Sequence, residues 1–132
     1  MTHPHEDLLR RYFKAAETGD LTVLDELFDD DVVGHTAGSH ELAGDHVGKQ
    51  EVFAFFGQLA ERSGGTATLR PRALAVDDWF AVALVDAAGR VGDATIDGEP
   101  TVFVLRIANG KFVEWWSHHY DQDAMDRFWA GA

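Results

Sequence analysis

The chain has 132 residues, of which 45% are hydrophobic, and this composition is typical of one globular domain with a single core. The formal net charge of −12 disfavours binding to nucleic-acid phosphates and to anionic membranes. Because the sequence contains no cysteine, disulfides, a thiolate nucleophile and cysteine-ligated zinc are excluded.

The first seven residues show neither the basic segment nor the apolar segment of a signal peptide. No apolar run in the sequence approaches the roughly 20 residues that a membrane-spanning helix needs. We therefore expect a cytoplasmic protein, organised as one domain over residues 1–132.

Helical spacing of hydrophobic residues predicts three helices in the first half of the chain. The first has Tyr12 in its apolar stripe and ends at Gly19, and Asp20 caps a short second helix. The three aspartates at 29–31 end that helix in a solvated turn. A third helix is expected over residues 49–62.

The second half of the chain is predicted to be a run of strands, with an earlier short strand at residues 32–36. Residues 79–85 form a nearly continuous apolar strand, and residues 86–89 are expected to end it. Residues 90–96 either extend that strand or begin the next one. Helices followed by a meander of strands are typical of an α+β domain.

The strongest local signal is a hairpin, because Asn109 and Gly110 separate two β-rich runs, 101–107 and 112–120. Alternation along the second run divides its side chains into two sets, Trp115, Ser117 and His119 on one face and Trp116 and His118 on the other. Both faces therefore carry Trp and His, which indicates a sheet that is covered on both sides. A short helix over 122–129 follows.

The order of these segments carries a resemblance to a known fold family. The resemblance rests on the segments 11–21, 27–32, 42–56, 109–116 and 126–129. In this order the chain resembles the nuclear-transport-factor-2-like superfamily, whose enzyme branches include the ketosteroid isomerases and the SnoaL-like polyketide cyclases. The resemblance covers nearly the whole chain.

This resemblance implies a cystatin-like α+β cone, in which N-terminal helices pack on the concave face of a strongly curved mixed or antiparallel sheet. It also implies a blind apolar pocket between the helices and that face and a homodimer through the convex face. The family hosts several activities as well as inert binding modules, so the fold alone does not select one.

Two positions resemble the catalytic pair of the ketosteroid isomerases. Tyr12 is similar to their oxyanion tyrosine, although a core residue with a satisfied hydroxyl is the alternative. His35 is similar in position to their general-base aspartate, and a neutral imidazole can take a proton at neutral pH. A structural or exposed histidine is the alternative there.

Two other positions depart from the family pattern. Phe103 stands where the isomerases have a second, protonated acid, so half of their oxyanion hole is missing. Ser117 stands near the catalytic aspartate of the SnoaL-like cyclases, and a hydroxyl without an adjacent base does not replace an acid.

His119 shares the predicted concave face with Trp115 and Ser117, and with His35 it would form a two-imidazole pocket. The alternative is a polar residue at the pocket rim. The residues expected to line the pocket are Phe56, Trp79, Phe103, Trp115 and Ser117. The seven histidines show no metal-ligand spacing, so no metal site is expected.

The sequence thus supports two main hypotheses. The first is a small, cofactor-independent acid–base enzyme, of an isomerase, cyclase or hydratase kind, acting on an apolar molecule with a carbonyl group. Tyr12 would polarise the oxygen, His35 would move the proton and His119 would assist. The second is a non-catalytic ligand-binding or dimerisation module, and a partner-protein adaptor is a third possibility.

Overall fold

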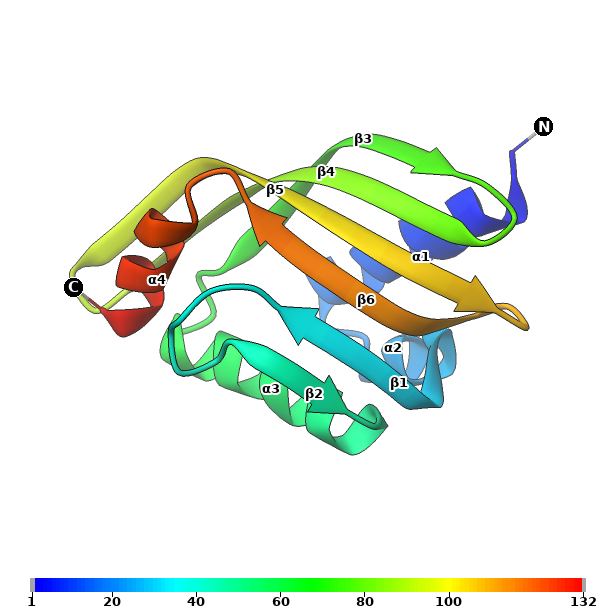
Figure 1. Cartoon of the computed structure of the whole chain (residues 1–132), viewed down its shortest axis with the longest axis horizontal. Coiled ribbons are helices and arrows are strands. Elements are labelled where there is room, and N and C mark those ends of the chain that lie inside the picture. The colour runs from blue at the N-terminus through cyan, green and yellow to red at the C-terminus, as the bar shows by residue number, and fades with distance from the viewer. Residues whose placement is uncertain (1, 132) are drawn as a thin grey trace.

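The structure is a computed structural model that describes residues 2–131. In this part the chain forms four helices and one six-stranded sheet (Figure 1). The elements in chain order are α1 (Pro4–Thr18), α2 (Leu21–Leu27), β1 (Phe28–Thr36), β2 (Gly44–Val47), α3 (Lys49–Arg62), β3 (Thr68–Val76), β4 (Phe80–Val91), β5 (Ala94–Ala108), β6 (Lys111–His119) and α4 (Gln122–Ala130).

Local sequence signals set the ends of the helices. Helix α1 begins with Pro4, whose fixed φ suits the first turn, and ends at Gly19, whose φ of +71° is left-handed. Asp20 caps α2 by accepting a hydrogen bond from the Val23 amide at 3.2 Å. Within residues 2–131, no helix is long and apolar enough to cross a membrane.

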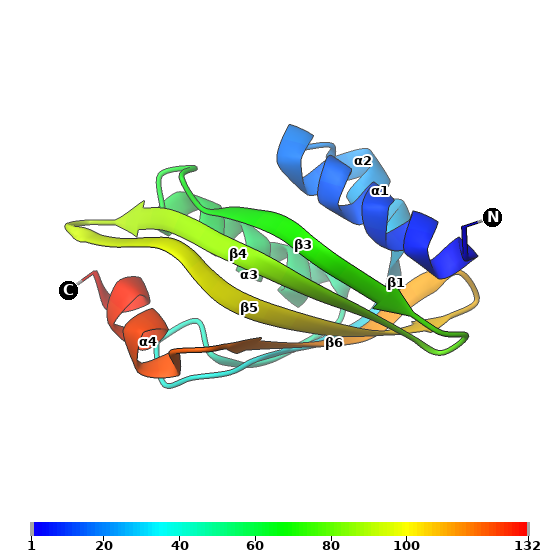
Figure 2. The same ribbon diagram turned by 90° about the horizontal axis from the view of Figure 1, so that it is seen from above.

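The sheet has the strand order β2-β1-β6-β5-β4-β3. Neighbouring strands are antiparallel except β1 and β6, which run parallel, so the sheet is mixed. Figure 2 shows how strongly the long β4–β5 hairpin bends, with α1 and α2 on one side of the sheet and α4 beside the far end of the hairpin. The predicted α+β architecture with a curved sheet is confirmed.

Strand register divides the sheet into two faces. Phe103 pairs with Ser117 and Leu105 pairs with Trp115, so these four side chains lie on one face, which we call the helix-side face. Trp115 stacks on two aromatic rings of α3, those of Phe55 and Phe56, at centroid distances of 5.8 and 6.3 Å. The helices therefore cover this face, as the alternation along residues 112–120 predicts.

Several strand boundaries differ from those predicted. Strand β1 begins at Phe28 and includes the aspartates 29–31, two of which are exposed, so the expected turn there is wrong. The expected break at 86–89 is also wrong, because a β-bulge between Ala87 and Ala88 lets β4 continue to Val91. The edge strand β2 was not predicted, since its four residues lack a clear alternation.

Candidate functional site

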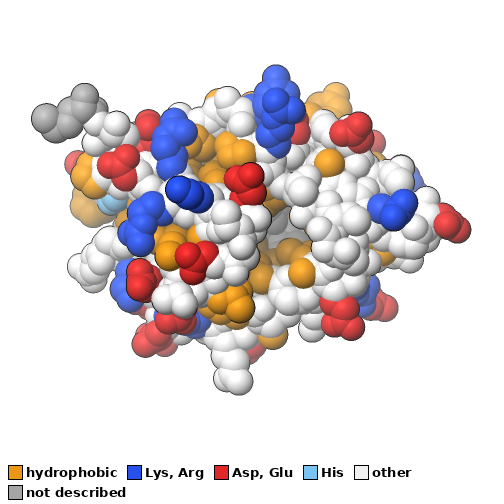
Figure 3. Space-filling view, turned by 180° about the vertical axis from the view of Figure 1, so that it is seen from behind, with side chains coloured by type: hydrophobic (Ala, Val, Ile, Leu, Met, Phe, Trp, Pro, Cys, Tyr) orange, Lys and Arg blue, Asp and Glu red, His pale blue; other side chains and the backbone are white. Residues whose placement is uncertain are grey.

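The side of the molecule that carries the helices is hollowed near its centre, and hydrophobic side chains surround the hollow (Figure 3). Partly buried hydrophobic residues from α1, α3 and the helix-side face pack against the core. They include Tyr12, Phe13, Phe56, Leu59, Leu74 and Phe103. These residues have apolar surface that is neither fully buried nor fully exposed.

Tyr12 projects from α1 into an aromatic environment. Its ring contacts those of Phe28 and Phe112 edge-on, at centroid distances of 5.9 and 6.1 Å. Its hydroxyl makes no hydrogen bond to any residue in the described part of the chain. Burial raises the pKa of Tyr12 to about 12, so the phenol keeps its proton at neutral pH and can donate it to a ligand oxygen.

His119 lies on the helix-side face near the end of β6. Its Nδ1 is 2.6 Å from the hydroxyl of Thr101. Thr101 is fully buried, and its hydroxyl donates to the Glu99 carbonyl at 3.3 Å. Burial, and then the neighbouring charges of His40 and His118, lower the pKa of His119 to about 4. The ring is therefore neutral at physiological pH and is held in place through Nδ1.

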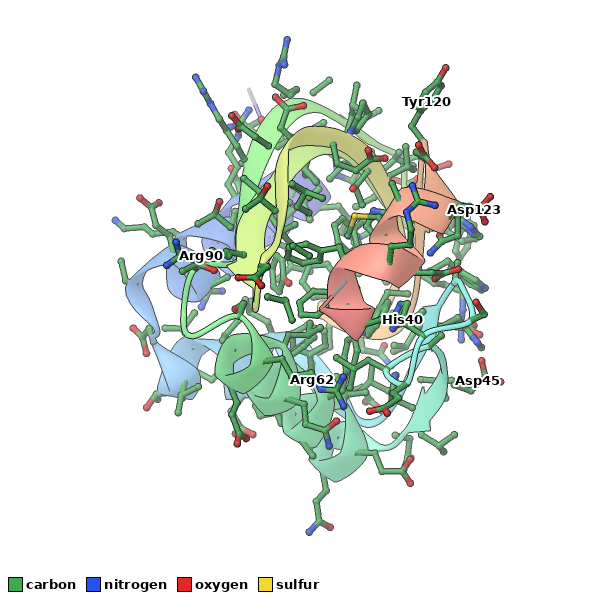
Figure 4. The ribbon with its side chains drawn as sticks, turned by 90° about the vertical axis from the view of Figure 1, so that its left-hand side faces the viewer. His40, Asp45, Arg62, Arg90, Tyr120 and Asp123 are labelled. Carbon is green, nitrogen blue, oxygen red and sulfur yellow. The ribbon has the colours of Figure 1, made fainter. Side chains whose placement is uncertain are left out.

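His40 is a second imidazole close to His119, and it was not predicted. It lies in the loop between β1 and β2, beside α4, with its ring 6.3 Å from that of Trp129 (Figure 4). Burial lowers the pKa of His40, and its Nδ1 accepts a hydrogen bond from the Leu42 amide at 3.2 Å. In the neutral ring the proton must therefore lie on Nε2, which makes Nε2 a donor.

Three buried polar atoms lie at this end of the sheet without a hydrogen-bond partner among residues 2–131: Nε1 of Trp115, Nε2 of His40 and Oγ1 of Thr36. Thr36 pairs with Ser117 and Gly34 pairs with Trp115, so Thr36 and Trp115 are neighbours on the helix-side face. We call these three atoms the buried donors. Each unpaired buried donor costs roughly 1–3 kcal/mol, so an acceptor that reaches any of these groups stabilises the protein.

His35 does not lie in this site, so its predicted placement beside Tyr12 is wrong. In the parallel β1–β6 pair it is opposite Trp116, on the outer face of the sheet, and its ring stacks on that indole at 5.3 Å. Its Nδ1 and Nε2 are each 2.7 Å from a carboxylate, of Asp45 and Glu114 respectively. Burial lowers its pKa, but the bonds to Glu114 and Asp45 outweigh burial and raise the pKa above its ordinary value.

The other predicted lining residues divide in the same way. Phe56, Phe103, Trp115 and Ser117 lie at the helix-side face, where Trp115 and Ser117 are buried. Trp79 does not, because it lies in the turn before β4 and is 69% exposed. The apolar run after Asp78 is partly turn rather than strand, and this explains the incorrect placement of Trp79 as core or pocket wall.

Two surface depressions lie away from these residues. One, of about 300 Å³, lies between α4 and the end of the β4–β5 hairpin, and the other, of about 200 Å³, lies between α1 and α2. Neither is lined by Tyr12, Trp115 or His119. Among residues 2–131 no cluster of three His, Asp or Glu side chains has the arrangement of a metal site.

Comparison with known proteins assigns the family. The profile of the SnoaL-like domain matches residues 9–115. The chain belongs to the SnoaL-like family. An uncharacterized protein of Mycobacterium tuberculosis is 30% identical to this SnoaL-like chain over 125 residues, which covers 94% of the chain and 95% of the relative.

Solved structures agree with the SnoaL-like assignment. Bal32a, from a soil-derived mobile gene cassette, superposes with a TM-score of 0.91 at 30% identity, covering 96% of both chains. A protein of unknown function with a cystatin-like fold from Xanthomonas campestris gives 0.88 at 30% identity, covering 93% of this chain and 95% of its own. A putative SnoaL-like polyketide cyclase from Jannaschia sp. CCS1 gives 0.78 at 16% identity, covering 98% and 94%, which shows the shared fold alone.

Proposed function

We propose that this SnoaL-like protein is a small acid–base enzyme that acts, without a cofactor, on an apolar molecule with a carbonyl group. The observation that carries the proposal is His119, a neutral imidazole fixed by Thr101 on an otherwise largely apolar face. In this proposal His119 has the role of base that we first expected of His35, rather than an assisting role. Membership of the SnoaL-like family makes an enzymatic role plausible without selecting a reaction, since the fold alone does not determine function.

In the proposed reaction, Nε2 of His119 removes a proton from the carbon next to the carbonyl group of the ligand. The electron pair left on carbon moves into the carbonyl, and negative charge develops on its oxygen. A donor positioned at that oxygen stabilises the charge. The phenol of Tyr12 keeps its proton, but its ring lies against Phe112 at the opposite end of β6 from His119, so it is not placed for this role. Return of the proton to a different carbon, or attack of the enolate on a second carbonyl, completes an isomerisation or a cyclisation.

The low pKa of His119 has a consequence for this mechanism. A base with a pKa of about 4 is weak in the empty site, although all of it is in the basic form at neutral pH. Negative charge on the ligand oxygen would stabilise the imidazolium, and the nearby carboxylate of Asp126 already raises the pKa of His119 in part. The bound intermediate therefore supplies basicity that the free protein lacks.

A non-catalytic ligand-binding module is the second candidate, and a specific observation favours it. Phe103 and Ser117 face each other across β5 and β6 on the helix-side face, and neither side chain ionises at physiological pH. With His35 on the outer face, His119 and His40 are the titratable side chains that we place at this end of the hollow. A hollow with donors and a weak base suits binding without turnover.

An activity screen with unsaturated ketones and small lactones tests the enzyme and separates the two candidates. We expect His119→Gln to lower turnover by about 10²–10⁴-fold, the usual contribution of a positioned acid–base group. Tyr12→Phe is expected to change turnover far less than His119→Gln, because the Tyr12 ring lies against Phe112 at the opposite end of β6 from His119. His35→Gln is the matched control, because it removes an imidazole on the outer face.

The outcomes are distinct. Ligand binding with no turnover in the wild-type protein would establish the binding module. Turnover that falls equally in His35→Gln and His119→Gln would reject the assignment of His119 as the base.

We also propose that the outer face of the sheet binds a second copy of the chain. The centre of this face is apolar and is formed by Val82, Leu84, Val102, Val104 and Trp116. Leu84 is 40% exposed. Charged pairs border this apolar centre, Arg72 with Asp86 and Arg106 with Glu114. A two-fold axis across such a face pairs like with like apolar surface.

A further inference from the structure

Residues 37–43, the loop between β1 and β2, connect two helices that are far apart in the sequence. Asp126 of α4 accepts hydrogen bonds from the amide and the hydroxyl of Ser39, at 3.1 and 3.0 Å. On the opposite side, Arg62 at the end of α3 pairs with Glu41 and donates to the Trp129 carbonyl at 3.5 Å. The loop is therefore held at both ends by polar contacts, and Figure 4 shows His40 and Arg62 where these elements meet.

The loop backbone also fits closely against α4. Gly38 has a φ of +113°, and a Cβ added to it would lie 2.3 Å from Oδ1 of Asp126 and 2.5 Å from Nε2 of Gln122. Gln122 in turn donates to the Ala37 carbonyl at 3.3 Å. Only glycine permits this approach, so the contact between loop and helix depends on one residue.

The loop lies next to the buried donors. His40 belongs to it, Thr36 directly precedes it, and Trp115 is a neighbour of Thr36 on the helix-side face and is only 4% exposed. The three atoms are sealed from solvent and yet have no partner in residues 2–131. Closing the loop over unpaired donors is unfavourable, so an acceptor that reaches them stabilises a rearranged state.

We propose that residues 37–43 form a lid, latched by Asp126 and Arg62, over a subsite in which Trp115, His40 and Thr36 bind an acceptor oxygen of the ligand. The inference rests on the proposed function only in placing the ligand in the same hollow. It adds a chemical class. The Trp115 and His40 groups are donors only, so the subsite takes a ketone, ester or lactone oxygen in preference to an ammonium group, which has no lone pair to accept from them.

The latch is tested first without any ligand, by amide hydrogen exchange. The reporters are the amides of Ser39 and Leu42, which donate to Asp126 and to His40. Removing a charged acceptor weakens the closed state, so in Asp126→Ala we expect these amides to exchange about tenfold faster or more. The β5–β6 amides serve as an internal reference.

Asp123→Ala is the matched control, because it removes an exposed carboxylate from the first turn of the same helix. Arg62→Met loosens the other side of the latch and is a second test if Asp126→Ala folds poorly. Faster exchange confined to the loop in Asp126→Ala or Arg62→Met supports the lid. Loop exchange that matches Asp123→Ala, or that rises only together with the β5–β6 amides in both variants, overturns it.

The subsite is tested with 2-cyclohexenone as the probe and with cyclohexene, which has the same ring without the oxygen, as its control. The indole N–H resonance of Trp115 is assigned by its loss in Trp115→Phe. We expect the ketone to move this resonance downfield, and to bind about tenfold more tightly to Asp126→Ala, where the latch no longer opposes entry.

Equal shifts with both probes, or a Trp115 resonance that the ketone leaves unchanged, overturn the subsite. Neither experiment measures turnover. A failure of the lid or the subsite is therefore distinguishable from a failure of the proposed enzymatic activity.

Discussion

Gly34 sits under the indole of Trp115, and replacing it tests how that ring is held. A Cβ added at Gly34 would lie 2.2 Å from Cζ2 of Trp115, 2.3 Å from Cε2 and 2.8 Å from Cη2. These atoms belong to a ring that is 4% exposed and stacked between the sheet and the aromatic side chains of Phe55 and Phe56. Gly34→Ala must therefore displace the indole, the strand or α3.

The expected cost follows from the packing. Overpacking a core by one methyl group typically costs about 1–3 kcal/mol. An unfolding entropy of about 2.1 cal/mol/K per residue over 132 residues converts this into a fall in Tm of roughly 4–11 °C. Gly57→Ala is the opposite case, because Gly57 is exposed within α3 and an added Cβ meets nothing within 4 Å in the described structure. There we expect a gain of about 0.5–1 kcal/mol.

Differential scanning calorimetry and urea unfolding of the two variants provide the measurement. A double-mutant cycle then isolates the clash, because Trp115→Leu removes the three atoms that the new methyl group would meet. The cost of Gly34→Ala should shrink in the Trp115→Leu background. A Gly34→Ala protein as stable as wild type, or a cost that is the same in both backgrounds, would refute the packing argument.

Three further predictions concern charge and assembly. The pKa of His35 is raised in the folded protein, so its pairing contributes stability that is complete below pH 6.5 and is lost as pH rises through the folded pKa. The pKa of Glu114 is lowered, so its contribution to stability is lost only as pH falls below 4.5. The difference in unfolding free energy between wild type and His35→Gln should therefore be largest at about pH 5–6 and shrink by pH 9, and equal differences would contradict the pairing. For His119, NMR titration should give a pKa of about 4, and a neutral ring at pH 5.5 is the diagnostic result. Leu84→Asp should convert a dimer into a monomer in sedimentation velocity at micromolar concentration, and a wild-type monomer would end the dimer proposal.

The sequence predicted the features that depend on local geometry. The Asn109–Gly110 turn pairs Ala108 with Lys111 and Ile107 with Phe112, and a bulge then shifts the register of β5 against β6 by one residue, so that Arg106 pairs with Glu114. That Trp115, Ser117 and His119 share one face was predictable from alternation, because the pairing is regular from Glu114 to His119. The helix ends at Gly19 and Asp20 were predictable for the same reason, since each capping contact lies within one turn.

The position of His40 could not be found in this way. It belongs to a loop without periodicity, and its neighbours Trp129 and His119 come from the other end of the chain. The one available signal was the length of the segment 37–48, since long loops in compact domains are often functional. That signal indicates a region but does not select a residue or a contact.

The exclusion of His35 from the site illustrates a more general limit. Strands β1 and β6 are parallel and are separated by most of the chain, so no turn fixes their register. Because side chains alternate, a shift of one residue would exchange His35 with Gly34 and bring the imidazole to the helix-side face. The observed register is the one that the indole of Trp115 requires, since only glycine leaves room for it at position 34. The packing of one tryptophan thus decides which histidines are available for chemistry, and it leaves His119 and His40 at the site.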